Sequence, residues 1–260
     1  MFKQTEIAAA NPICRRYCAD VITLLIATRN VHKVGEIRAI LGGSFQFQTL
    51  NDFHGAPEVV EDAPTFAGNA TKKAVELAQW LAAKHPTSSF VLADDSGLEV
   101  DVLEGGPGVH SARFAALDRS PDGSSASFTG NSSDAANNAK LLRLLQDIPL
   151  EQRRARFKCV LALVPVPEPK TTSSSPVCYA DEFEVQTFDG TCEGRIGFEP
   201  QGKKGFGYDP LFMPVGLDQT FAELGEDVKN KLSHRAKALE KLKDYFTASE
   251  PRQKPSFDSL

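Results

Sequence analysis

Apolar residues recur along the chain at two spacings, one typical of buried strands and one typical of helices. The run Val21–Ala27 is apolar except for Thr23, and such a short β-branched and leucine-rich run predicts a strand buried on both faces. Turn and N-cap residue types follow at Thr28-Arg29-Asn30, before apolar residues at helical spacing: Val31, Val34, Ile37, Ile40 and Leu41. Gly42-Gly43 then predicts the end of that helix. The sequence therefore begins its folded part with a strand that leads directly into a helix.

The same spacings predict the later elements. Helices are expected from Pro64-Thr65 to His85-Pro86, over Ser133–Gln146 and over Asp227–Phe246. Strands are expected at Phe90–Ala93, at 98–102, at 157–163 and, as hairpin partners of the last, at Glu182–Phe188 and Glu193–Phe198. This order predicts a single α/β domain with a mixed sheet.

Segments without periodicity mark the limits of that domain. Met1–Asp20 is expected to be a disordered extension and 249–260 a flexible tail, which leaves 21–248 as the folded domain. Asp118–Ser132 and Pro165–Pro176 are rich in Ser, Pro, Gly and Asp, and we expect loops there.

Composition and charge narrow the classes of function. The 260 residues are 41% apolar and 24% charged, with a formal net charge of −5, which is typical of a globular protein. No apolar run approaches the roughly 18 residues that a membrane span needs. A mildly acidic chain also argues against a broad basic face for nucleic acid. An anionic substrate must therefore be bound by a local cluster of cations.

The five cysteines form no C-x-x-C pair, and no secretory signal precedes the domain. An odd number of cysteines without a signal peptide predicts reduced thiols and a cytoplasmic location.

The first candidate site is the segment Thr28–Lys33, at the start of the first helix. A buried strand that leads into a helix presents free backbone N–H groups, and the helix dipole favours an anion there. Thr28 and Asn30 add a hydroxyl and an amide, and Lys33 adds a cation, although the glycines of a Walker loop are missing. An ordinary capped helix with a solvated lysine remains the alternative.

The second candidate is Ala93-Asp94-Asp95-Ser96-Gly97, at the expected end of a buried strand. Carboxylates at this place can hold Mg²⁺ or orient a water molecule as a general base. Adjacent strand residues point to opposite faces, so Asp94 and Asp95 are not expected to share one role. A simple turn is the alternative, because Asp, Ser and Gly all favour turns.

Two further segments carry aromatic and basic residues. In Gly205-Phe206-Gly207-Tyr208-Asp209-Pro210 the glycines allow close approach of a ligand, and the aromatic rings can stack on a base. On the expected last helix, Arg235 falls within the apolar stripe and needs an anionic partner. That partner is either a structural carboxylate or a bound phosphate.

Taken together, these segments resemble the inosine triphosphate pyrophosphatase family, also called Ham1-like, of dITP/XTP pyrophosphatases. The matching motifs occur in the family's order: Thr28-x-Asn30-x-x-Lys33, Thr65-Phe66-x-x-Asn69-Ala70, Ala93–Leu98, Pro107–Phe114, Phe206–Pro210 and Ser233-His234-Arg235. They span Leu24 to about Leu242, which is over four-fifths of the chain.

The resemblance implies a fold and a reaction. The expected fold is a single elongated, bilobed α/β domain with a central mixed β-sheet flanked by helices. The expected reaction is Mg²⁺-dependent hydrolysis of ITP, dITP or XTP to the monophosphate and pyrophosphate, which cleanses the nucleotide pool. The resemblance also implies a homodimer.

The resemblance assigns roles to individual residues. Asp95 would be the catalytic base and a metal ligand, and Glu61 the second metal ligand, with Glu58 in reserve. Substrate-binding residues would be Ser96 and the segment Thr28, Arg29, Asn30, Val31, His32 and Lys33, which would hold the triphosphate. The purine would be read by Phe206, Gly207, Tyr208, Asp209, Lys229, His234 and Arg235.

Two other functions remain open at this point. One is a Maf-like pyrophosphatase that acts on pyrimidine or modified nucleotides. The other is a nucleotide-binding regulator without turnover. The intact Asp95 motif argues against the regulator.

Overall fold

A single mixed sheet of six strands forms the centre of the molecule, seen in a computed structural model that describes residues 21–84, 90–118, 130–166 and 183–248. The strands are β1 (Thr23–Ile26), β2 (Gln46–Thr49), β3 (Phe90–Val100), β4 (Arg154–Pro165), β5 (Gln186–Ile196) and β6 (Phe212–Pro214). Their order in the sheet is β2-β1-β3-β4-β5-β6. Strand β1 is parallel to β2 and β3, and the remaining pairs are antiparallel. This confirms the predicted mixed α/β sheet.

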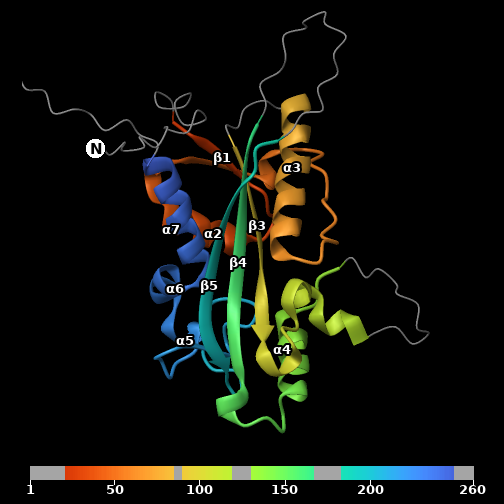
Figure 1. Cartoon of the computed structure of the whole chain (residues 1–260), viewed down its shortest axis with the longest axis vertical. Helices are drawn as coiled ribbons and strands as arrows, with labels where there is room; N and C mark the ends of the chain where they lie inside the picture. Colours follow the sequence, from red (N-terminus) through yellow and green to blue (C-terminus); the bar gives the residue numbers. More distant parts are fainter. Residues whose placement is uncertain (1–20, 85–89, 119–129, 167–182, 249–260) are drawn as a thin grey trace, which may run out of the picture.

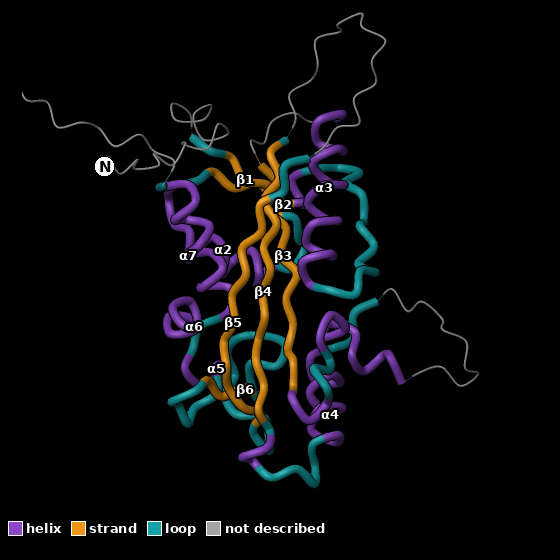
Figure 2. The backbone as a smooth tube through the Cα atoms, in the orientation of Figure 1, coloured by secondary structure: helices purple, strands orange, loops and turns teal. Residues whose placement is uncertain are grey.

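Helices cover both faces of the sheet. They are α2 (Val31–Leu41), α3 (Phe66–Lys84), α4 (Asp134–Leu144), α5 (Phe221–Leu224), α6 (Glu226–Leu232) and α7 (His234–Thr247). Figure 1 shows α2, α6 and α7 on one side of the long strands, with α3 and α4 on the other. Figure 2 shows that β3, β4 and β5 run most of the length of the elongated molecule.

Side-chain alternation along the strands explains why helices are needed on both faces. Leu24 and Ile26 pack with α2 and α7, whereas Leu25 and Ala27 pack with α3. The other half of the sheet has its own core, in which Leu98 and Phe157 pack with α4 and α5 residues. Both faces of the sheet are therefore buried, as the apolar runs predicted.

The turn from β1 into α2 follows local chemistry. The side chain of Asn30 accepts hydrogen bonds from the backbone N–H groups of His32 and Lys33, at 2.9 and 3.2 Å, and so caps the helix. Gly42 ends the helix with a positive φ of 67°.

Two predicted strands had the wrong limits. Strand β3 continues to Val100, so Asp94-Asp95-Ser96-Gly97 lies inside a strand and not at its end. Strand β5 replaces the two segments expected at Glu182–Phe188 and Glu193–Phe198, because its register with β4 continues unbroken through Asp189 and Gly190. Polar and small residues within both strands favour turns, but pairing with the neighbouring strand overrides this local propensity.

The long final helix was also predicted wrongly. It breaks at Ser233, which ends α6 and caps α7 by accepting a hydrogen bond from the N–H of Ala236. Leu232, at the end of α6, is 42% exposed, whereas Leu239, Leu242 and Phe246 on α7 are buried. Strands β2 and β6 had no sequence signal, since each is very short.

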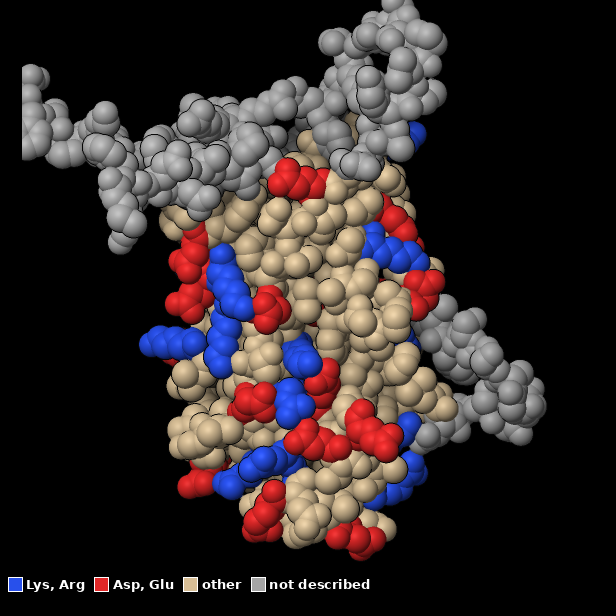
Figure 3. Space-filling view, in the orientation of Figure 1, with Lys and Arg blue, Asp and Glu red and all other residues tan. Residues whose placement is uncertain are grey.

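The expected extension at 1–20 and tail at 249–260 lie outside the described residues, as do most of the predicted loops at 118–132 and 165–176. Across the described ranges, no helix is long and apolar enough to cross a membrane. The face in Figure 3 intersperses basic with acidic side chains.

Gly190 allows α7 to lie close against β5. A Cβ atom on Gly190 would come 2.0 Å from the backbone oxygen of His234 and 2.7 Å from the backbone nitrogen of Ala238. Because both neighbours are backbone atoms, relief would require α7 to move.

We therefore expect Gly190→Ala to lower the free energy of unfolding by about 2 to 3 kcal/mol. The measurement is urea unfolding of the full chain. Gly43→Ala is the matched control, because a Cβ there meets nothing within 4 Å. Equal stability of the two variants would contradict the close packing of α7 on β5.

Candidate active site

The two aspartates in the middle of β3 point to opposite faces of the sheet. Asp94 lies on the side of α2 and α7, where it contacts Lys33 and Arg235. Asp95 lies on the side of α3, where the charges of Glu61 and Lys73 act on it. The separation that alternation predicted for the two carboxylates is confirmed.

Asp94 is the most heavily engaged carboxylate of the site. Its oxygens accept hydrogen bonds from Lys33 Nζ at 2.5 Å, Arg235 Nε at 2.8 Å and Ser96 Oγ at 2.9 Å. The thiol of Cys159 lies 3.3 Å away. Burial raises the pKa of this carboxyl, but Arg235 and Lys33 outweigh it and hold the pKa well below its ordinary value. Asp94 is therefore a permanently charged structural anion.

The ion pairs continue from Asp94 toward α6. Glu36 accepts a hydrogen bond from Arg235 Nη1 through one oxygen and from Lys229 Nζ, at 2.7 Å, through the other. Lys229 Nζ also lies 2.5 Å from Asp209 Oδ2.

We call the set Lys33, Glu36, Asp94, Asp209, Lys229 and Arg235 the buried ion cluster. It contains three cations and three carboxylates, so its formal charges cancel. All members except Lys33 are less than 10% exposed. The cluster joins α2, β3, the 205–210 loop, α6 and the first turn of α7, which are far apart in the sequence.

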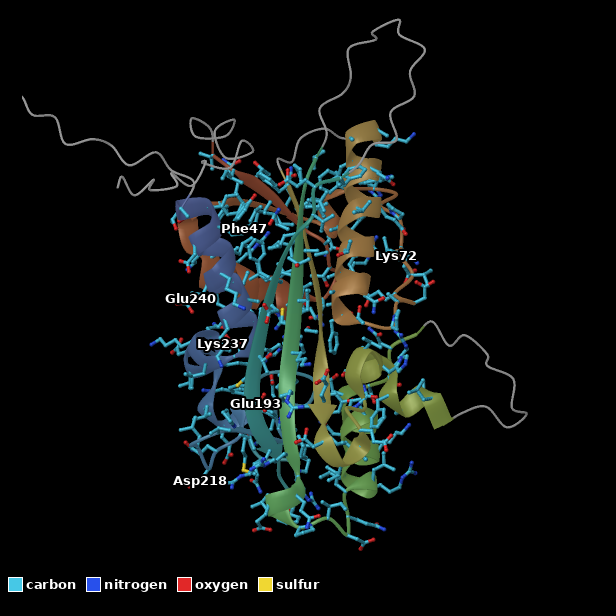
Figure 4. All side chains as sticks on the ribbon, viewed as in Figure 1. Phe47, Lys72, Glu193, Asp218, Lys237 and Glu240 are labelled. Atoms are coloured by element: carbon cyan, nitrogen blue, oxygen red, sulfur yellow. The ribbon has the colours of Figure 1, made fainter. Side chains whose placement is uncertain are left out.

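The other face of β3 carries a smaller group of charges. Lys73 Nζ lies 2.6 Å from Glu61 Oε1 and donates to the backbone oxygen of Asp94 at 3.1 Å. The preceding Lys72 instead projects from the outer side of α3 (Figure 4) and pairs with the exposed Asp62. Glu58, the reserve candidate for a metal ligand, is exposed. The geometry thus brings Glu61, not Glu58, to Asp95.

Asp95 itself has an unusual environment. It is 5% exposed, and its Oδ2 has no hydrogen-bond partner among the described residues. Burial raises the pKa of Asp95 to about 6; the negative charge of Glu61 adds to this, and Lys33 opposes it. This carboxyl is therefore poised to bind a cation or a proton.

Aromatic residues lie at the Lys229 end of the ion cluster. Lys229 Nζ is 4.3 Å from the centroid of the Phe206 ring, and the N–H of Phe206 donates to Asp209 at 2.8 Å. Tyr208 is buried and donates to the backbone oxygen of Ser111 at 2.9 Å, so it anchors the loop in the core. A pocket of about 210 Å³ borders Phe206, His32, Glu36 and Lys229.

The structure places the remaining candidates as follows. Thr28 accepts a hydrogen bond from the N–H of Asn30 at 3.1 Å, and Arg29 is exposed and donates to the backbone oxygen of Ala56 at 3.3 Å. Val31 is 68% exposed beside the pocket, and the backbone oxygen of Gly207 accepts from Asn138 at 3.0 Å.

Arg235 and His234 are both fully enclosed. Arg235 is 1% exposed and is paired with Asp94 and Glu36, so a structural carboxylate satisfies the inward-facing arginine. The His234 ring stacks on Phe157 with centroids 4.8 Å apart. Burial lowers the pKa of His234 well below its ordinary value, and nearby Arg235 and Lys229 lower it further, so this ring is neutral.

Sequence reasoning missed Glu36 and Lys73. Glu36 lies one helical turn after Lys33, beside the buried Ile37, and that position was the only signal for it. Lys73 lies next to Ala70 and Ala74 on the buried face of α3, whereas Lys72 does not. The burial of a charged side chain follows from its partners, which come from distant segments.

The described residues contain no group of three or more His, Cys, Asp or Glu arranged to hold a metal. Among these described residues, the two neighbouring carboxylates Asp95 and Glu61 are the candidate metal ligands. That number suits Mg²⁺, which takes one or two protein carboxylates together with water and phosphate oxygens.

Comparison with known proteins shows which family the sequence resembles over most of its length. Residues 24–245 match the family model described as the Ham1 family. The chain is 44% identical over 225 residues to the dITP/XTP pyrophosphatase of Exiguobacterium sibiricum, covering 86% of this chain and 96% of that protein. It is 45% identical to the dITP/XTP pyrophosphatase of Desulforamulus reducens, with 84% and 92% covered.

A solved structure gives the same result for the fold. The Staphylococcus aureus Ham1 protein is 31% identical and superimposes with a TM-score of 0.66, covering 88% of this chain and all of that one.

Removing the charge of Glu36 from the ion cluster is expected to lower the stability of the fold. We expect Glu36→Gln to lower the free energy of unfolding by about 3 kcal/mol, because Arg235 and Lys229 lose a buried counter-charge. Urea unfolding measures this. Glu226→Gln, on the same pocket but exposed, is the control and should change stability by less than about 0.5 kcal/mol. A wild-type value for Glu36→Gln would show that the cluster does not stabilise the fold.

Removing the charge of Asp95 is expected to raise the stability of the fold. Its pKa of about 6 lies above the ordinary 3.8, so the folded state bears the cost of the buried charge at neutral pH. In metal-free buffer at pH 7.5, Asp95→Asn should therefore be more stable than the wild type by about 3 kcal/mol.

The sign of the pH dependence provides a second check. The folded wild type binds a proton more readily than the unfolded chain between pH 6 and 3.8, so its disadvantage shrinks as the pH falls through that range. The two melting temperatures should converge near pH 4, and exposed Asp147→Asn should show no such convergence. A gap that stays constant with pH would contradict the buried charge.

Proposed function

The chain belongs to the Ham1 family, and from that premise we propose that it hydrolyses deaminated purine nucleoside triphosphates (ITP, dITP and XTP) to the monophosphate and pyrophosphate. The observation that carries the proposal is Asp95, a buried carboxyl with a raised pKa and an unpartnered oxygen, beside Glu61 and across β3 from Lys33. The relatives' names favour this reaction over the Maf-like alternative.

We propose that Asp95 and Glu61 hold Mg²⁺. The fit rests on the chemistry of the donors, because both are carboxylates and one Asp95 oxygen is buried without a partner. The bound ion would supply positive charge against the phosphate oxygens as charge develops on the leaving pyrophosphate.

The ion cluster gives a reason for requiring such an ion. Each of its three cations is already paired with a carboxylate, and Lys73 is paired with Glu61. A triphosphate brings several negative charges, which this neutral cluster does not offset. Additional positive charge is therefore needed where the phosphates bind.

The protein's own residues then have separate tasks. The start of α2, where the helix dipole favours an anion, binds the phosphates together with Thr28, Arg29, Asn30 and Lys33. Asp95 accepts a proton from the water molecule that attacks the α-phosphorus, and its raised pKa suits a base near neutral pH. Ser96 donates to Asp94 and accepts from Arg235, so its hydroxyl would meet the substrate from the α2 and α7 side of β3, opposite Asp95.

The purine would lie at the Phe206 end of the cluster. Phe206 offers a ring for stacking, and Lys229 and Asp209 fix the backbone that carries it. The first N–H groups of α7, at His234 and Arg235, lack acceptors within the helix and can donate to the 6-oxygen of a deaminated purine. The amino group of adenine would leave those donors unpaired.

The homodimer implied by the resemblance and the cytoplasmic location inferred from the cysteines stay predictions. Sedimentation of the purified chain tests the first, and fractionation of the source cells tests the second.

The proposed reaction predicts a specific panel of activities. Pyrophosphate release should occur from ITP, dITP and XTP, with kcat/KM at least about 100-fold above that for ATP. Chelation of Mg²⁺ should abolish it. Equal kcat/KM for ITP and ATP would contradict the proposed recognition of the 6-oxygen.

Asp95→Asn should lower kcat by about a thousandfold or more. Asp147→Asn, which removes an exposed carboxylate, serves as the control. Normal turnover by Asp95→Asn, despite its greater stability, would refute the role of Asp95.

A further inference from the structure

The imidazole of His32 lies against the ring of Phe206. The ring centroids are 5.2 Å apart and the planes differ by 15°, which is an offset stack. His32 is in the first turn of α2, and Phe206 is in the loop after β5, so two distant segments meet through these rings.

The backbone and the side chain of His32 belong to different parts of the site. The His32 N–H donates to the Asn30 side chain within the helix cap, next to the proposed phosphate site. Its imidazole instead faces the aromatic end of the site. The sequence predicts that the whole of Thr28–Lys33 binds the triphosphate, whereas this ring lies toward the proposed place of the base.

The imidazole is also free to move. The residue is exposed, and within the described ranges its ring makes the stack with Phe206 but no hydrogen bond or ion pair. Rotation of the side chain would separate the two rings without disturbing the cap on α2.

Both rings border the same pocket, which also meets Glu36 and Lys229. The ammonium of Lys229 lies over the Phe206 ring as well. A planar, uncharged aromatic group would therefore find two rings and a cation at one place.

We propose that His32 is the second ring of the base subsite, and that the purine binds between Phe206 and His32. Two aromatic rings that enclose a third lie about 7 Å apart, so the imidazole must swing outward by about 2 Å and restack on the outer face of the base. This inference rests on the proposed function, since it assigns a residue to the base of that substrate.

If His32 stacks on the base, its substitution should change KM and leave kcat nearly unchanged. Loss of one ring from a base stack weakens binding by about five- to tenfold, in ground state and transition state alike. His32→Ala should therefore raise KM for ITP by that factor and change kcat by less than about twofold. His32→Phe should restore KM, because it restores an aromatic ring at this position.

A charged substitution separates this role from phosphate binding. His32→Lys introduces a cation but no ring, and it should leave KM as high as His32→Ala does. Inhibition by inorganic tripolyphosphate, which has no base, should be equal in all variants. His54→Ala, which removes another exposed histidine, is the control.

Any of three results would overturn the assignment: a KM in His32→Ala that is unchanged or lower, rescue by Lys but not by Phe, or a parallel loss of tripolyphosphate inhibition. If the wild type releases no pyrophosphate from ITP, the proposed function fails instead. NMR titration of the wild type then tests the stack directly: inosine monophosphate should shift the His32 ring signals and tripolyphosphate should not. Absent shifts with inosine monophosphate would reject the role of His32.

Discussion

The buried ion cluster around Asp94 is the interaction on which the rest of the site depends. Burying a single unpaired charge is very costly, so Arg235 at 1% exposure can exist only with Asp94 and Glu36 in place. Each of these carboxylates has a second cation, and Lys229 has a second carboxylate in Asp209. Satisfying any one member fixes the positions of its neighbours.

That chain of pairs sets the geometry of the two ends of the site. Lys33 lies at one end, at the start of α2, and Asp209 at the other, where it binds the N–H of Phe206. The proposed phosphate site and the proposed base site are therefore linked by charged contacts through the protein. Because the cluster is neutral, Asp95 and Glu61 on the opposite face of β3 remain the carboxylates available to a metal.

Much of this fold was predictable because burial follows spacing. Period-two alternation predicted that Asp94 and Asp95 lie on opposite faces of the sheet. Helical spacing predicted that Arg235 faces inward with Leu239 and Leu242. The co-linear motifs were sufficient to identify the family. These features depend on residues close together in sequence.

The missed features depend on distant partners. Glu36 resembles a solvated helix residue until Arg235 and Lys229 are brought to it. The strand through Asp94 and Gly97 is held by pairing with β4, although its own residues favour turns. The helix breaks at Ser233 because its side chain caps α7, and the apolar spacing, which continues across Ser233, gives no sign of this break.

The most direct test of the linked cluster is a double-mutant cycle on Asp94→Asn and Glu36→Gln, measured as free energies of unfolding in urea. The two carboxylates share Arg235, so their effects should be non-additive by about 1 kcal/mol or more. Effects that add to within about 0.3 kcal/mol would show that the two act independently, which contradicts a single cluster organised around Asp94.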